Sequence, residues 1–203
     1  MATRAIRILE VRGIRLKCRY GGPAIDSEDI IVATRRWLEV SVIGLNLCPF
    51  AESVYRGDRV RFRVSEQRSA SALLQDLRQE LTSLHEADPE CCETTLLIHP
   101  WVLTDFIEYN DFLEVCDGTL VDMGLEGELQ IASFHPQYRF SGTQPEDIDN
   151  YTNRSPHPML HLLREASIER VLSAVPDPDE IYRRNIRTLR GLGHEGWQKL
   201  WRA

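Results

Sequence analysis

Apolar and polar positions follow two different periods along the chain, and each period predicts a different kind of element. Between 60 and 64, Val60, Phe62 and Val64 alternate with arginines, which predicts a half-buried strand. The segments 94–99 and 129–135 are largely apolar or small, as in strands that are covered on both faces. Both segments end in His-Pro, which indicates that the two strand ends have equivalent places in the fold.

Apolar side chains spaced by three and four residues predict five helices around these strands. Capping residues mark the starts, with Asp26 or Ser27 at the first helix and Ser69 at the second. Gly124 and Gly191 mark the ends of the third and fifth helices. The helices run from 26 to the segment LNLCPF at 45–50, from 69 to 84, from 100 or 101 to 123, from 158 to about 174, and from 178 to 190.

The resulting order of elements is α-β-α-β-α-β-α-α. Strands that alternate with helices of this length form βαβ units with parallel strands. We therefore predict an α/β (or α+β) fold with a small, mostly parallel three-stranded core sheet and helices packed on its faces. If the second and third strands are neighbours, His99 and His135 lie within roughly 10 Å of each other at the carboxyl edge, where open α/β sheets bind ligands.

Imidazoles at such an edge are candidates for acid/base catalysis near neutral pH. The alternative is that each histidine is a hydrogen-bonded structural residue at a strand end. Cys48 is expected near the same edge, as a nucleophile or a ligand, because the turn after the first helix delivers the chain to the sheet and Pro49 fixes its exit.

A polar segment of 23 residues, 136–158, separates the third strand from the fourth predicted helix. Loops of this length inside a compact domain are usually functional or disordered. Asn153, Arg154 and Ser155 stand just before the predicted helix, so they and its first N–H groups predict a site for a carboxylate or phosphate. The alternative is a capping turn whose arginine tethers the loop.

Within that predicted helix, His161, Arg164 and Glu165 fall on one face. Glu165 would then hold the imidazole in one tautomer, and Arg164 would support anion binding. The alternative is a solvated ion pair. A zinc-type site formed by Cys48, His99, His135 and His161 is a further possibility, although none of these pairs has the short spacing of a metal motif, so no cofactor is predicted.

Composition restricts the choice of partners and compartment. The 203 residues carry a net charge of −7, which argues against a nucleic-acid partner, and no apolar run approaches the roughly 18 residues of a membrane span. Five cysteines without a C-x-x-C pair fit a reducing cytoplasm. Residues 1–25 form a basic arm, 26–193 a single α/β domain and 194–203 a C-terminal tail. The oligomeric state does not follow from the sequence.

Six motifs, in this order and spacing, carry a family resemblance: GLNLCPF, TTLLIHP, YNDFL, SFHP, YTNRSP and LHLLRE. From about Thr34 to Leu192 the chain resembles the bacterial family called domain of unknown function 1415. The resemblance brings no activity with it. It implies that the recurring family motifs include Cys48, His99, Asn110, Asp111, His135, Asn153, Arg154, Ser155, His161, Arg164 and Glu165.

These expectations combine into one function. The chain is expected to be a cytoplasmic small-molecule enzyme that acts on an anionic substrate at the carboxyl edge of the sheet. His99 or His135 would be the acid/base, with Cys48, His161 and Glu165 as further catalytic candidates. Arg154 would bind the anion. Two alternatives remain: a metal-dependent enzyme at the same edge, and a ligand-binding or interaction protein without catalysis. The substrate-binding candidates are Arg154, Asn153, Ser155, Arg164, Asn110 and Asp111.

Overall fold

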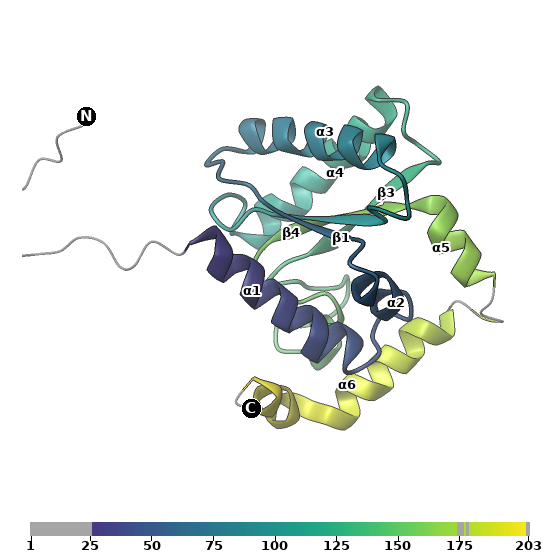
Figure 1. Cartoon of the computed structure of the whole chain (residues 1–203). Coiled ribbons are helices and arrows are strands. Elements are labelled where there is room, and N and C mark those ends of the chain that lie inside the picture. Colours follow the sequence, from purple (N-terminus) through teal and green to yellow (C-terminus); the bar gives the residue numbers. More distant parts are fainter. Residues whose placement is uncertain (1–25, 174–176, 178, 202–203) are drawn as a thin grey trace, which may run out of the picture.

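A four-stranded mixed sheet forms the centre of the protein, in a computed structural model that describes residues 26–173, 177 and 179–201 (Figure 1). The strand order is β1-β2-β4-β3. β1 runs parallel to β2, whereas β4 is antiparallel to both of its neighbours, β2 and β3. The predicted basic arm, 1–25, lies outside the described residues. The strands are β1 Val60–Val64, β2 Thr94–Ile98, β3 Leu129–Phe134 and β4 Met159–Arg164.

Helices cover the two faces of the sheet, and each face has its own apolar core. On one face, which α3 and α4 cover (Figure 1), leucines of α3 pack with Tyr109 and Phe112 of α4. On the other, Ile30 and Trp37 of α1 and Val42 of the following π-helix pack against the sheet. The helical elements are α1 Ser27–Trp37, the π-helix η1 Leu38–Ile43, α2 Ala51–Arg56, α3 Ala70–Glu86, α4 Phe106–Asp122, the 3-10 helix η2 Ile148–Thr152, α5 Glu165–Leu172 and α6 Asp179–Leu200.

The mixed α/β class is confirmed, but the three-stranded, mostly parallel sheet is wrong. The segment 159–164, predicted to open a helix from 158 to about 174, is the strand β4, and it lies between β2 and β3. Its side chains are apolar on both faces because Leu160 and Leu162 face the α3–α4 core while Met159 faces the α1 core. A strand covered on both faces loses the alternation that distinguishes it from a buried helix.

Several predicted helix ends differ from the structure. Ser69 caps α3 as expected, through an Ala72 N–H···Oγ bond of 3.3 Å. α4 begins at Phe106 rather than at 100 or 101, because Asp105 accepts hydrogen bonds from the N–H groups at 107 and 108. α6 continues to Leu200, past the predicted end at 190, with a break at Gly193, whose φ is 63°. Most of the predicted C-terminal tail is therefore helical.

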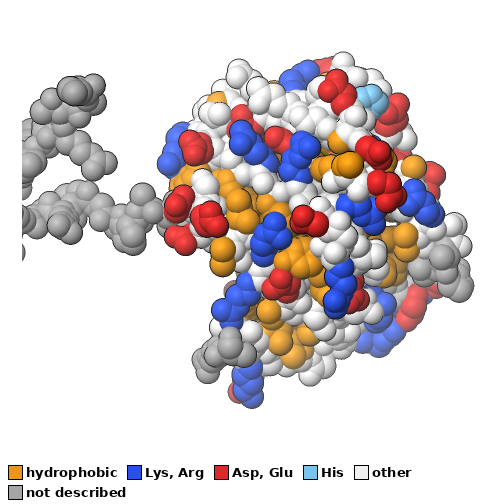
Figure 2. Space-filling view, in the orientation of Figure 1, with side chains coloured by type: hydrophobic (Ala, Val, Ile, Leu, Met, Phe, Trp, Pro, Cys, Tyr) orange, Lys and Arg blue, Asp and Glu red, His pale blue; other side chains and the backbone are white. Residues whose placement is uncertain are grey.

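Positive and negative side chains lie close together on one face of the protein. On the face seen in Figure 2, Lys and Arg side chains are interspersed with Asp and Glu. Within the described ranges, no helix has the length and apolar character that crossing a membrane requires.

Candidate functional site

The predicted histidine pair lies at one edge of the sheet, on the face that α4 covers. β2 and β3 point in the same direction but are separated by β4. His99 and His135 are both fully buried, and each ring packs against Tyr109, with centroid distances of 5.7 and 5.1 Å. The Tyr109 hydroxyl donates to the Met159 carbonyl at 2.9 Å and accepts from the Phe134 N–H at 3.1 Å. Tyr109 thus ties two strand ends together between the histidines.

These two imidazoles have hydrogen bonds that favour a structural role. His99 Nδ1–H donates to the Val102 carbonyl at 2.9 Å, and His135 Nδ1 accepts from the Gln137 N–H at 3.0 Å. Burial lowers the pKa of His99 to about 4 and also lowers the pKa of His135. Their Nε2 atoms are buried and have no hydrogen-bond partner in the part of the chain that the structure describes. The pair is therefore neutral at pH 7 and has no access to solvent.

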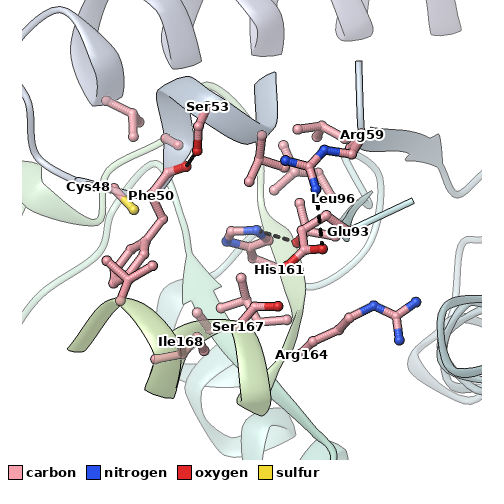
Figure 3. A pocket seen from close by; sticks show the side chains of 18 of the residues that line it. Cys48, Phe50, Ser53, Arg59, Glu93, Leu96, His161, Arg164, Ser167 and Ile168 are labelled. Atoms are coloured by element: carbon pink, nitrogen blue, oxygen red, sulfur yellow. Dashed lines mark hydrogen bonds and ion pairs between the residues drawn. The ribbon is translucent and has the colours of Figure 1, made fainter. Parts of the chain in front are cut away.

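The opposite face of the sheet carries a cavity of about 350 Å³ (Figure 3). Its floor is the sheet, and its roof is formed by η1, the turn before α2, α2 itself and α5. Most of its lining is apolar, including Trp37, Phe50 and Phe134. This volume lies at the low end of the range for small-molecule sites.

His161 occupies the middle of the cavity floor, between Leu96 of β2 and Ala132 of β3. Its Nε2 lies 2.7 Å from Thr94 Oγ1, which itself donates to the Leu162 carbonyl. Because that hydroxyl proton is already used, Nε2 is the protonated nitrogen and Nδ1 keeps its lone pair. Nδ1 has no hydrogen-bond partner among the described residues. Burial lowers the pKa of His161 to about 4, so the imidazole is neutral at pH 7.

Cys48 lines the same cavity, in the turn between η1 and α2. Burial raises the pKa of its thiol, and this effect exceeds the opposing effects of the N–H groups of Phe50 and Ala51 and the charge of Arg184. A raised pKa leaves the sulfur as a thiol at neutral pH, which disfavours a nucleophilic role. Cys48 is therefore close to the predicted catalytic histidine His161, but on the opposite face of the sheet from His99 and His135.

Glu93 and Arg59 form the polar side of the cavity, on the side where Figure 3 shows both next to His161. Glu93 directly precedes β2 and is only 7% exposed. Arg59 Nη1 lies 3.7 Å from the Glu93 carboxylate and 3.9 Å from that of Glu90. Both distances exceed hydrogen-bond length. The Glu93 carboxylate accepts no hydrogen bond from the described part of the chain.

The residues expected to bind an anion are engaged with the protein itself. Arg154 donates to the carbonyls of Tyr138 and Pro145 and stacks on Tyr151, with its guanidinium carbon 4.3 Å from the ring centroid. Asn153 Nδ2 donates to the Ser133 carbonyl at 3.1 Å. These contacts favour the alternative in which the arginine tethers the loop. They also follow from β4 being a strand, because the predicted helix N-terminus beside Arg154 does not exist.

The remaining predicted site residues are also dispersed. Ser155 donates to the His157 carbonyl, and Arg164 donates to the carbonyls of Leu84 and Ala87 at the end of α3 and to that of Cys92 shortly before β2. Asn110 and Asp111 lie exposed on α4. Glu165 begins α5, so the common helix face predicted for it with His161 and Arg164 does not exist.

The proposed zinc ligands do not come together. His99 and His135 lie on the α4 face, whereas Cys48 and His161 line the cavity on the other face. Across the ranges 26–173 and 179–201, no three His, Cys, Asp or Glu side chains are grouped so that they could hold a metal ion.

Fold and cavity together define a mixed α/β protein with a largely apolar cavity of small-molecule size against its sheet. Residues 29–199 match the family described as Protein of unknown function (DUF1415), and the chain belongs to this family. The resemblance carried by the six motifs is thus confirmed. No curated protein and no solved structure matches the chain significantly.

Sequence analysis missed Glu93, Arg59 and Ala132. Glu93 had the clearest signal of the three, because it is an acidic residue directly before a segment that was predicted to be a buried strand. Ala132 gave no signal of its own. Its role follows only from the register that pairs it with His161, and that register depends on β4 being a strand.

Proposed function

We propose that the cavity is the active site of a small-molecule enzyme in which His161 is the proton acceptor. One observation carries this proposal: an imidazole in the floor of a mostly apolar cavity has one nitrogen fixed by Thr94 and the other without a partner among the described residues. A fixed tautomer gives the lone pair of Nδ1 a definite direction, which a general base needs. The sequence-based expectation of His acid/base chemistry is thereby transferred from His99 and His135 to His161.

The apolar surroundings support the proposal because a water-poor site strengthens each polar interaction with a bound molecule. Ala132 contributes by its small size. A larger side chain at this position of β3 would fill the space beside the imidazole, since Ala132 is the direct cross-strand neighbour of His161.

A metabolite library tests binding first, by the rise in melting temperature that a bound compound causes. Compounds that bind in the cavity should stabilise the wild type and the control variant Ala166→Leu, whose substitution is on the exposed side of α5. They should not stabilise Ala132→Leu. Equal stabilisation of all three proteins would show that the compounds bind elsewhere and would contradict the proposal.

Turnover of the bound compounds tests the catalytic part. His161→Gln should lower kcat by about 100-fold or more, the usual contribution of a general base, while the affinity changes little. A loss of affinity with unchanged kcat would remove His161 from the chemistry.

A second candidate function, ligand binding without catalysis, is favoured by the neighbour of His161. Thr94 provides no negative charge to stabilise an imidazolium, and burial lowers the pKa of His161 to about 4. Compounds that stabilise the wild type but not Ala132→Leu, and that are recovered unchanged after long incubation, would support ligand binding without catalysis.

A further inference from the structure

The carboxylate of Glu93 is a charged group that accepts no hydrogen bond from the described residues. Its side chain is 9% exposed and lines the cavity. Its nearest cation, Arg59, is 3.7 Å away, beyond hydrogen-bond length. A buried carboxylate has room for about four hydrogen bonds and is costly to leave without them. The unused acceptors of Glu93 therefore favour a ligand that brings donors.

Nearby arginines do not favour an anion at this place. Arg59 shares its charge between Glu93 and Glu90. Arg164 places its guanidinium on the carbonyls of Leu84, Ala87 and Cys92, so its positive charge offsets the negative end of α3. Arg170 is exposed on α5 and screened by solvent. Glu93 is therefore the charged group whose interactions inside the cavity are least complete.

Aromatic side chains set the character of the rest of the cavity. Trp37 and Phe134 pack edge to face, with ring centroids 5.3 Å apart, and Phe50 lines the wall near Cys48. The indole is held in place because its Nε1–H donates to the Arg154 carbonyl at 2.8 Å. Fixed rings of this kind bind a flat apolar group by edge or face contact.

We propose that the ligand is a small primary amine with an aromatic or similarly sized apolar body, its ammonium group on Glu93 and its body among Trp37, Phe50 and Phe134. This inference rests on the proposed function and assigns a substrate class to the same cavity. In Figure 3, His161 lies between Glu93 on one side and Phe50 and Cys48 on the other, so a ligand that spans both ends of the cavity passes over its imidazole.

Three probes of nearly equal shape test the ammonium group: 2-phenylethylamine, 2-phenylethanol and 3-phenylpropanoate. Isothermal titration calorimetry at pH 7 with the full chain should show that the amine binds about ten-fold or more tightly than the other two, as expected for a charge-assisted hydrogen bond. Glu93→Gln should weaken amine binding by about ten-fold or more and change alcohol binding by less than about three-fold.

Glu90→Gln is the matched control, because Glu90 is the other partner of Arg59, carries the same charge, and has a side chain that is 86% exposed outside the cavity lining. This variant should bind the amine as the wild type does. Circular dichroism checks that Glu93→Gln remains folded. The ranking of the three probes by their affinity for the wild type is a test that needs no variant.

Two results would overturn the inference. In the first, the wild type binds the propanoate more tightly than the amine, and Ala132→Leu abolishes the binding of whichever compound binds. This result would assign an anionic ligand to the cavity and leave the proposed function intact. Failure of all three probes to bind would remove the aromatic amine class, and the metabolite library would then decide the proposed function separately.

Discussion

The guanidinium of Arg164 closes the C-terminal end of α3. It donates to the carbonyls of Leu84 and Ala87, both at 2.6 Å, and to that of Cys92 at 3.2 Å. The last carbonyls of a helix have no partner within the helix, and a cation there also meets the negative end of the helix dipole. Arg164 thereby connects the end of β4 to the helix on one face of the sheet.

Replacing this arginine should therefore lower stability. We expect Arg164→Met to reduce the free energy of unfolding by about 2–4 kcal/mol, because three partly buried carbonyls lose a charged donor. Urea unfolding measures the change. Arg170→Met, a matched substitution of an exposed arginine, should stay within about 0.5 kcal/mol of the wild type. If both substitutions have equally small effects on the free energy of unfolding, water satisfies the three carbonyls as effectively as Arg164 does.

Among the helical elements, the π-helix η1 connects α1 to the turn that carries Cys48 and contributes Leu38 and Val42 to the cavity. Gly44 follows it directly and donates its N–H to the Glu39 carbonyl, five residues earlier, at 2.9 Å. A Cβ atom at Gly44 would lie 2.4 Å from the Val40 carbonyl oxygen, a distance that backbone atoms cannot accommodate without moving. The wide turn therefore depends on glycine.

Gly44→Ala should cost about 1–3 kcal/mol of stability, the usual range for overpacking against a rigid neighbour. Gly118→Ala in α4 is the control, because a Cβ atom there meets nothing within 4 Å. Alanine is the better helix former, so this control should gain about 0.5–1 kcal/mol. Thermal unfolding of the two variants checks both signs, and a stabilised Gly44→Ala protein would refute the role given to glycine.

At the scale of elements, the strands 60–64 and 94–98 and the capped helix from 69 were predictable, because alternation, apolar runs and capping are local signals. β4 was not predictable in this way. Its sequence, MLHLLR, is apolar on both faces because α3 and α4 cover one side and α1 the other, and this burial is a property of the whole fold. Because this segment was predicted to be a helix, the predicted site was also wrong. Arg154 was expected beside a helix N-terminus, and Glu165 was expected on the same helix face as His161.

For the molecule as a whole, four buried or partly buried histidines make stability depend on pH. Burial lowers the pKa of His99 and His161 to about 4, from 6.5 in an unfolded chain, and it also lowers the pKa of His135 and His157. Between pH 6.5 and 4 the unfolded chain therefore binds more protons than the folded protein does. Stability is complete above about pH 6.5 and is lost as the pH falls through this window.

Urea unfolding at pH 7.5, 6.5, 5.5 and 4.5 measures this loss. Each histidine that stays neutral in the folded protein contributes about 1.4 kcal/mol per pH unit below 6.5. His161→Gln removes a histidine that faces the cavity. It should reduce the slope of the free energy of unfolding against pH by the contribution of about one proton. A free energy of unfolding that stays constant from pH 7.5 to 5.5 would show that the buried imidazoles take up protons without unfolding.

We expect that His161, and not the buried pair His99 and His135, is the histidine that contacts the ligand. Nitrogen NMR of the histidine rings, in protein labelled at those rings and titrated with compounds that raise its melting temperature, tests which histidine makes this contact. At pH 7 we expect that His161 is neutral with its proton on Nε2, that its Nδ1 signal moves on binding, and that the signals of His99 and His135 stay in place. Movement of the His99 or His135 signals while His161 Nδ1 stays unchanged would contradict this expectation.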